Sequence, residues 1–218
     1  MKIVVIGATG GSGRAAVERL VAEGHEVTAF SRNADPLREI SSSIRVLNGD
    51  VMNEEDLDRA IAGQDAVVVT LGISESALRV RLFGAAKTRD DVRSAGTRNV
   101  IRAMRRHGVQ KLVVQTSFGV GETKTKLPFI YDLMFKMLLK QQIADTERQE
   151  EEVRASGLDW VLAQPVNLTD AVTEGPAFAS AAGETRSMKI SRREVGRFLA
   201  EAAQSSAFVG RSVALSSV

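Results

Sequence analysis

An N-terminal strand followed by three regularly spaced glycines restricts the fold more than any other feature. Residues 2–6 form a β-branched run typical of a buried strand, and Gly7, Gly10 and Gly13 follow at once. From Arg14 onward, apolar residues recur at helical spacing. A strand, a glycine turn and a helix N-terminus in this order form a cradle for a diphosphate, because glycine allows close approach and the first helical N–H groups are unpaired. The pattern therefore predicts dinucleotide binding.

Strands and helices are expected to alternate along the rest of the chain. Apolar runs predict strands at 26–30, 44–47, 66–71, 111–117, 158–163 and 209–215. Helices are expected from Asp35, from Asn53, and over 92–107, 127–139, 144–156 and 192–203, with a loop over 168–189. No repeat or linker divides residues 1–218. We expect one α/β domain with a Rossmann-like fold, a doubly wound, mostly parallel sheet with helices on both faces. Segments near 118–142 and 166–190 are expected on its substrate side.

The end of the second strand indicates which cofactor is used. A carboxylate about 20 residues beyond the glycine turn selects NAD, whereas an arginine suits the 2′-phosphate of NADP. Here the strand ends at Ser31 and Arg32, which favours NADPH, although a solvated loop charge is the alternative. After the third strand, Asp50 and Val51 can contact adenine, or Asp50 can simply cap the turn.

Composition excludes several other classes of protein. The chain has no cysteine, which rules out disulfides and cysteine metal sites, and its two histidines are far apart, so no metal site is expected. A net charge of +2 does not indicate a nucleic-acid or membrane partner, and no apolar run approaches the roughly 18 residues of a membrane span. We expect a cytoplasmic protein without a signal peptide, as a monomer or small homo-oligomer.

Polar residues at the later strand ends are candidates for the substrate side. Ser117 closes the fifth strand and Asn167 follows the sixth, where both would face the nicotinamide; the alternative for Ser117 is a serine that begins a turn. The basic stretch 73–91 either rims the pocket or is solvated. The Met- and Phe-rich segment 127–139 is either an adaptable wall for a flat ring system or ordinary core or subunit contact.

Several motifs together resemble a known family. Gly7-Ala-Thr-Gly-Gly-Ser-Gly13, Ser31-Arg32 and Gly49-Asp50-Val51 resemble the atypical short-chain dehydrogenase/reductases. Residues 49–69, 97–109, 116–117 and 156–158 are similar to the biliverdin-IXβ reductases, also called flavin reductases. The resemblance implies hydride transfer from NADPH to a planar conjugated acceptor, such as a flavin or a bilin. It implies the cofactor-binding residues Gly7, Thr9, Gly10, Gly11, Ser12, Gly13, Arg32, Asp50, Val51, Leu71, Gly72, Thr116 and Pro165.

Two departures concern the catalytic candidates, which are Ser117, Asn167 and Tyr131. The resembling enzymes have a histidine where this chain has Asn167, and asparagine is not a proton donor near neutral pH. The Tyr-x-x-x-Lys pair of the main short-chain dehydrogenases is missing, because Phe135 stands four residues after Tyr131. A carbonyl reductase working through that pair is therefore not expected, and the two departures favour the alternative of a non-catalytic NADP(H)-binding redox sensor or regulator. A different NADPH reductase, of a quinone or small carbonyl compound at the same site, is the other alternative.

Overall fold

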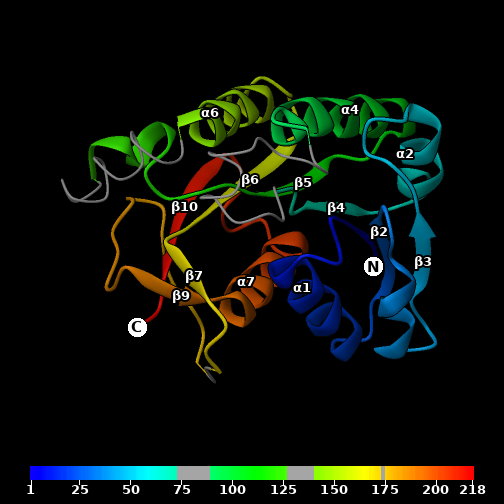
Figure 1. Ribbon diagram of the computed structural model, residues 1–218, viewed down its shortest axis with the longest axis horizontal. Helices are drawn as coiled ribbons and strands as arrows, with labels where there is room; N and C mark the ends of the chain where they lie inside the picture. Colours follow the sequence, from blue (N-terminus) through cyan, green and yellow to red (C-terminus); the bar gives the residue numbers. More distant parts are fainter. Residues whose placement is uncertain (73–88, 127–139, 173–174) are drawn as a thin grey trace.

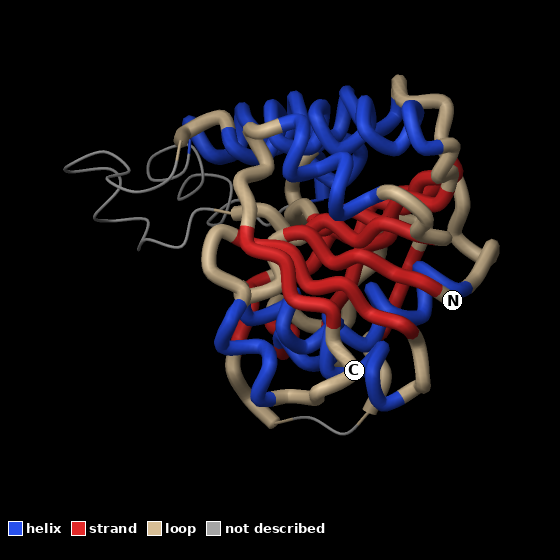
Figure 2. Tube along the Cα trace, turned by 90° about the vertical axis from the view of Figure 1, so that its right-hand side faces the viewer, coloured by secondary structure: helices blue, strands red, loops and turns tan. Residues whose placement is uncertain are grey.

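A computed structural model of the protein describes residues 1–72, 89–126, 140–172 and 175–218. The described chain forms three layers, with an eight-stranded sheet between two layers of helices (Figures 1 and 2). In spatial order the strands are β3 (Arg45–Asn48), β2 (Glu26–Ser31), β1 (Lys2–Ile6), β4 (Ala66–Val69), β5 (Lys111–Gln115), β6 (Asp159–Pro165), β10 (Arg211–Ser216) and β8 (Phe178–Ser180). Seven of these strands are parallel, and β8 pairs antiparallel with β10. The predicted doubly wound, mostly parallel sheet is confirmed.

Helices cover both faces of this sheet. One face carries α1 (Gly11–Ala22) and α7 (Arg192–Gln204), and the other carries α2 (Glu54–Ile61), α4 (Val92–His107) and α6 (Lys140–Arg154) (Figure 1). Two short 3-10 helices, η1 (Asp35–Glu39) and η2 (Gly121–Lys126), lie in the connections. Among the described helices, none is long and apolar enough to cross a bilayer.

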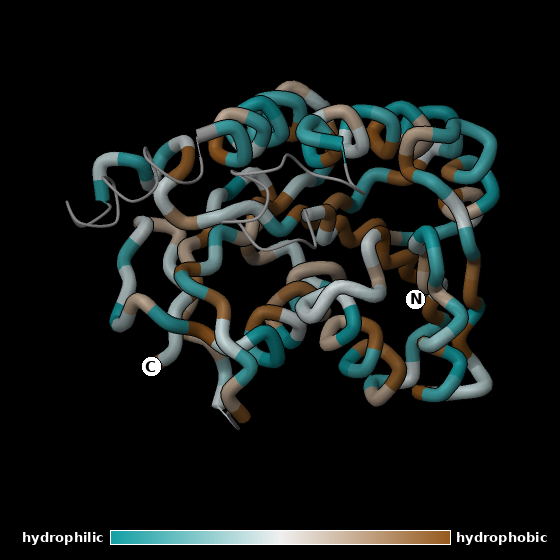
Figure 3. The backbone as a smooth tube through the Cα atoms, viewed as in Figure 1, coloured by the Kyte–Doolittle hydropathy of each residue, from teal (hydrophilic) through white to brown (hydrophobic). Residues whose placement is uncertain are grey.

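The strands are hydrophobic along their length because both of their faces are buried. Alternate residues of β1 serve the two layers: Ile3 and Val5 pack in the cluster containing α1 and α7, whereas Val4 and Ile6 pack in the cluster containing α2 and α4. Figure 3 shows hydrophobic residues concentrated along these central strands.

Two helix starts follow directly from their capping residues. The Asn53 side chain accepts hydrogen bonds from the first-turn N–H groups of α2, as expected for an N-cap. Ser191 and Glu194 form a reciprocal capping box at the start of α7.

Several predicted boundaries are wrong. The fourth and fifth strands end at Val69 and Gln115, so that Leu71, Gly72, Thr116 and Ser117 belong to the connections that follow them. The predicted loop 168–189 instead contains most of β7 (Asn167–Thr169), all of β8 and the first residue of β9 (Lys189–Ser191). Three-residue strands that pair with distant partners carry no alternating pattern, so the sequence does not mark them. The predicted helix 127–139, with Tyr131, lies outside the described residues.

Candidate functional site

A cavity of about 380 Å³ opens at the carboxyl ends of β1 to β4. The strand order reverses between β1 and β4, and this reversal is where open parallel sheets bind their ligands. The cavity brings together part of the expected cofactor set, namely Gly7, Thr9, Gly10, Arg32, Asp50, Val51, Leu71 and Gly72.

The glycine turn is packed too tightly for larger residues. Gly7 has a φ of +83°, and a Cβ there would lie 2.7 Å from the Thr70 carbonyl oxygen. A Cβ on Gly13 would lie 2.5 Å from the Gly7 carbonyl oxygen. The Thr70 hydroxyl, which the sequence pattern does not mark, donates to the carbonyl oxygens of Ile6 and Gly7 at 3.1 Å each. The residue that follows β4 thus holds the glycine turn in place through two carbonyl oxygens.

The first turn of α1 fits an anionic ligand. Among the described residues, no side chain caps this helix, and its first turn contains no acidic residue. Its N-terminal N–H groups, with the helix dipole behind them, therefore favour a diphosphate at the turn. Gly11, Ser12 and Gly13 form this turn of the helix, where a Cβ on Gly11 would meet the Arg192 side chain and a Cβ on Gly13 would meet the Gly7 carbonyl oxygen. The cradle fits the predicted cofactor.

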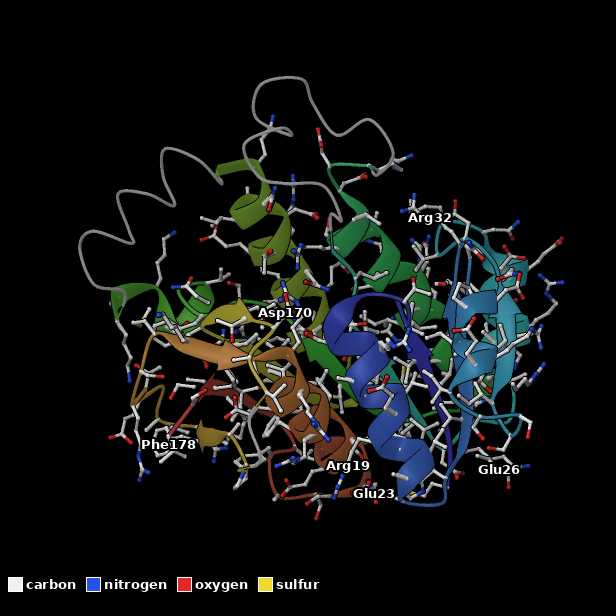
Figure 4. All side chains as sticks on the ribbon, turned by 60° about the horizontal axis from the view of Figure 1, so that its bottom comes forward. Arg19, Glu23, Glu26, Arg32, Asp170 and Phe178 are labelled. Atoms are coloured by element: carbon white, nitrogen blue, oxygen red, sulfur yellow. The ribbon has the colours of Figure 1, made fainter. Side chains whose placement is uncertain are left out.

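The outer end of the cavity is polar. Arg32 follows the last residue of β2 and lines the cavity, and Figure 4 shows its position. Asp50 lines it from the end of β3, and its Oδ1 also accepts the Met52 N–H at 2.9 Å, so that the turn-capping alternative is realised as well. Val51 presents an apolar side chain next to it.

Arg89 contributes a further cationic group to the cavity. It is the last residue but two of the basic stretch 73–91, of which 73–88 lie outside the described residues. Its Nε donates to Asp91 Oδ1 at 2.8 Å and its terminal nitrogen to Oδ2 at 3.0 Å. These hydrogen bonds hold the pKa of Asp91 below its usual range and raise that of Arg89. The bidentate pair with Asp91 thus holds the Arg89 guanidinium at the edge of the cavity.

The ends of β5 and β6 are joined by backbone hydrogen bonds around Ser117. The N–H of Thr116 donates to Ala163 at 2.8 Å, and that of Phe118 donates to Pro165 at 2.9 Å. Within the described part of the chain, the half-buried Ser117 hydroxyl makes only a long contact, 3.4 Å, to the Phe118 carbonyl oxygen. Asn167 is half-buried at the start of β7, where it pairs with Lys189 of β9. Both residues lie at neighbouring strand ends, outside the lining of the described cavity.

The Thr116 side chain points into the protein. Its hydroxyl donates to Glu150 Oε1 at 2.7 Å, and Gln164 Nε2 donates to the same oxygen at 2.8 Å. Arg154 donates to Oε2 of this fully buried carboxylate at 2.8 Å. The network fixes the ends of β5 and β6 to α6. Pro165 is likewise buried at the end of β6.

Comparison with known proteins agrees with this geometry. A family model described as NAD(P)H-binding matches residues 7–206. The chain belongs to this NAD(P)H-binding family. Membership accounts for the glycine turn, for the cavity at the strand reversal, and for a nicotinamide dinucleotide as the cofactor.

Two curated relatives are longer than this chain. The 2-alkyl-3-oxoalkanoate reductase of Stenotrophomonas maltophilia is 31% identical over 125 residues, which are 57% of this chain and 36% of that protein. The 3-beta-hydroxysteroid dehydrogenase of Mycolicibacterium neoaurum is 31% identical over 126 residues, or 55% of this chain and 32% of that protein. The chain thus spans about a third of the length of these curated relatives.

Solved structures share the whole fold. A Veillonella parvula short-chain dehydrogenase/reductase in complex with NADP superposes with a TM-score of 0.80 at 15% identity, covering 98% of this chain and 93% of that one. ChuY, an anaerobilin reductase from Escherichia coli O157:H7, gives 0.75 at 20% identity, with 99% and 96% covered. At these identities the likeness is one of fold.

Proposed function

We propose that the protein is an NADPH-dependent reductase that transfers hydride to a planar conjugated acceptor, such as a flavin or a biliverdin-type tetrapyrrole. The observation that carries the proposal is the arginine at the end of β2, facing a cavity whose inner end is the glycine cradle. A cation in this position suits the 2′-phosphate that distinguishes NADPH from NADH.

Each part of the site has a role in this proposal. Residues 10–13 bind the diphosphate, Arg32 binds the 2′-phosphate, and Asp50 and Val51 contact adenine. Thr9, Leu71 and Gly72 border the cofactor along the cavity, and Thr116 and Pro165 support its nicotinamide end. The bound cofactor supplies the hydride, which is the demanding chemistry.

On the acceptor side, the main role of the protein in this proposal is to bind the acceptor and orient it over the nicotinamide. Ser117 and Asn167 offer a hydroxyl and an amide at neighbouring strand ends, and such groups can hydrogen-bond a flat heterocycle. A flavin or bilin can take its proton from water, so orientation over the nicotinamide is the main requirement. Tyr131 as a proton donor stays a prediction, as do the substrate-side segments, the cytoplasmic location and the monomeric or small homo-oligomeric state.

A second candidate is reduction of a small carbonyl compound or a quinone at the same site. The names of the Stenotrophomonas and Mycolicibacterium relatives favour this candidate, since one is a reductase of a 3-oxoalkanoate and the other a dehydrogenase of a hydroxysteroid. A third candidate, a redox sensor that binds NADP(H) without turnover, is favoured by the asparagine at position 167.

An absorbance assay of NADPH oxidation separates the three. Purified protein is supplied with FMN, riboflavin, a biliverdin, a quinone or a 3-oxo acid, and with NADH in place of NADPH. The proposal expects turnover with a flavin or bilin, faster with NADPH, and reduced in Ser117→Ala. Turnover with the 3-oxo acid or quinone alone would shift the assignment to the second candidate. Tight NADPH binding with no acceptor reduced would favour the sensor.

A further inference from the structure

Arg192, the first residue of α7, lies across the glycine turn. A Cβ on Gly11 would overlap the Arg192 Cδ and would lie 2.9 Å from its Nε. The stem of the arginine therefore passes directly over the first residue of α1, where the helix N–H groups are exposed to an anion. This contact joins two residues separated by most of the chain, so no local motif indicates it.

The packing of the two helices explains this position. Gly196 of α7 contacts Ala15 of α1, and Arg192 contacts Gly11, so the contacting pairs are four residues apart on both helices. The two contacting pairs are thus about one helical turn apart along both helices, and the residue numbers increase in the same direction on each. The helices therefore run parallel, with their N-termini side by side. Figure 1 shows α7 beside α1 on one face of the sheet. The N-terminus of α7 is closed by its capping box, whereas no side chain in the described ranges caps that of α1.

Asp170 orients the guanidinium group. One terminal nitrogen of Arg192 donates to Asp170 Oδ1 at 2.7 Å, and Figure 4 labels Asp170 beside the N-terminal end of α1. The Asp170 side chain is 87% exposed, so the pair is weak by itself. It uses one of the five N–H donors of the guanidinium, which leaves donors to face a ligand at the turn.

We propose that Arg192 binds the diphosphate of the cofactor, opposite the N-terminus of α1, with Asp170 as its positioning residue. A planar, permanently charged fork is suited to phosphate oxygens, and the glycine at position 11 leaves the space through which it reaches them. The inference rests on NAD(P)H binding and not on which acceptor is reduced. It assigns a second cationic contact, distinct from Arg32, to the part of the cofactor that NAD and NADP share.

Calorimetric titration of the purified full chain tests this assignment. Arg192→Gln is compared with Arg193→Gln, which removes the same charge from the neighbouring, exposed position on the same helix. The probes are NADP⁺, NAD⁺, ADP-ribose and 2′-AMP, which lacks a diphosphate. We expect Arg192→Gln to weaken the three diphosphate ligands about tenfold and to leave 2′-AMP unchanged. Arg193→Gln should weaken all four by less than about twofold, as for a solvent-exposed charge that is screened by salt.

Two outcomes overturn the proposal. Equal affinities of wild type and Arg192→Gln for NADP⁺ would remove Arg192 from the site while leaving dinucleotide binding intact. An equal loss for 2′-AMP would mean that the substitution disturbs the whole cavity. Failure of the wild type to bind any of the probes would instead contradict cofactor binding itself.

A double-mutant cycle tests the role of Asp170. Asp170→Asn should weaken NADP⁺ about threefold in the wild type, by loosening the guanidinium, and should have no effect when Arg192 is already glutamine. Arg192→Lys should recover part of the affinity, since it keeps the charge but not the fork. Losses that add fully in the double variant would show that Asp170 does not act through Arg192.

Discussion

Gly196 of α7 lies against Ala15 of α1 so closely that a Cβ on Gly196 would come within 2.5 Å of the Ala15 Cβ. The same atom would lie 2.7 Å from the Ala16 backbone nitrogen. Since backbone atoms cannot rotate away, this approach depends on glycine. It sets the distance between the two helices, and with it the position of the glycine turn at the N-terminus of α1.

Gly196→Ala should therefore destabilise the fold. Overpacking against helix backbone costs about 1–3 kcal/mol in the free energy of unfolding, which urea denaturation measures. Gly175→Ala is the matched control, because the space around Gly175 is open and its φ is not positive. The control should stay within about 0.5 kcal/mol of wild type. A similar stability for both variants would mean that the helices can separate without cost.

The local patterns predict the part of the site built by consecutive elements. The strand, glycine turn and helix at the N-terminus are such a unit, and so are the strand ends that carry Arg32 and Asp50. Periodicity and turn chemistry suffice there. Arg192 and Thr70 were not expected near the turn, because a contact between distant elements leaves no mark in either local sequence.

The short strands were missed for a similar reason. β8 contains three residues and is stabilised by pairing with β10, which follows it by about thirty residues. Its residues have no alternation of their own that distinguishes them from a loop. The register of the whole sheet, and not the segment, determines that it is a strand.

Substitutions at two glycines of the turn, Gly13 and Gly10, should distinguish an effect on fold stability from an effect on NADP⁺ binding. Gly13→Ala places a Cβ against the Gly7 carbonyl oxygen and, at 2.6 Å, the Thr70 hydroxyl, so both stability and NADP⁺ affinity should fall. A Cβ on Gly10 would lie 3.4 Å from its nearest neighbour, so Gly10→Ala should keep the wild-type melting temperature. The added methyl group should nevertheless keep the diphosphate away from the backbone N–H groups and so lower the affinity for NADP⁺ by at least about tenfold. Thermal melts and calorimetry on both variants test this difference. Undiminished affinity in Gly10→Ala would argue against a diphosphate at the turn.

Glu150→Gln should destabilise the protein strongly. The carboxylate is 0% exposed and accepts hydrogen bonds from Thr116, Gln164 and Arg154. An amide reverses one hydrogen bond and leaves Arg154, among the described carboxylates, with only its 4.0 Å contact to the exposed Glu122, at a cost of about 3 kcal/mol in the free energy of unfolding. Glu147→Gln is the control on the same helix, since its contact with Lys124 is solvent-exposed and is worth about 0–1 kcal/mol. Equal effects of the two variants would contradict a structural role for the buried network.

The Arg89–Asp91 pair should make a pH-dependent contribution to stability. The hydrogen bonds from Arg89 lower the pKa of Asp91 in the folded state, so the pair stabilises the fold above the unfolded pKa of about 4. The contribution is lost as the pH falls through the lower, folded pKa. The difference in melting temperature between wild type and Asp91→Asn should therefore be constant from about pH 8 to 5 and disappear at lower pH. A difference that persists in acid would assign the effect to something other than this carboxylate.

Replacement of Arg32 should change cofactor choice and little else. If its guanidinium binds the 2′-phosphate, Arg32→Ala loses a charge-assisted interaction that only NADPH makes, and the KM for NADPH should rise by at least about tenfold. The KM for NADH should change less than about twofold, because NADH presents a hydroxyl in the same place. Arg38→Ala, from the exposed ion pair with Asp35 in η1 and outside the cavity lining, is the control for a general loss of positive charge. Equal increases in KM for the two cofactors would remove the 2′-phosphate assignment. If Arg38→Ala raised the KM for NADPH by the same factor, the effect of Arg32→Ala would be explained by long-range electrostatic attraction and not by a specific contact with the 2′-phosphate.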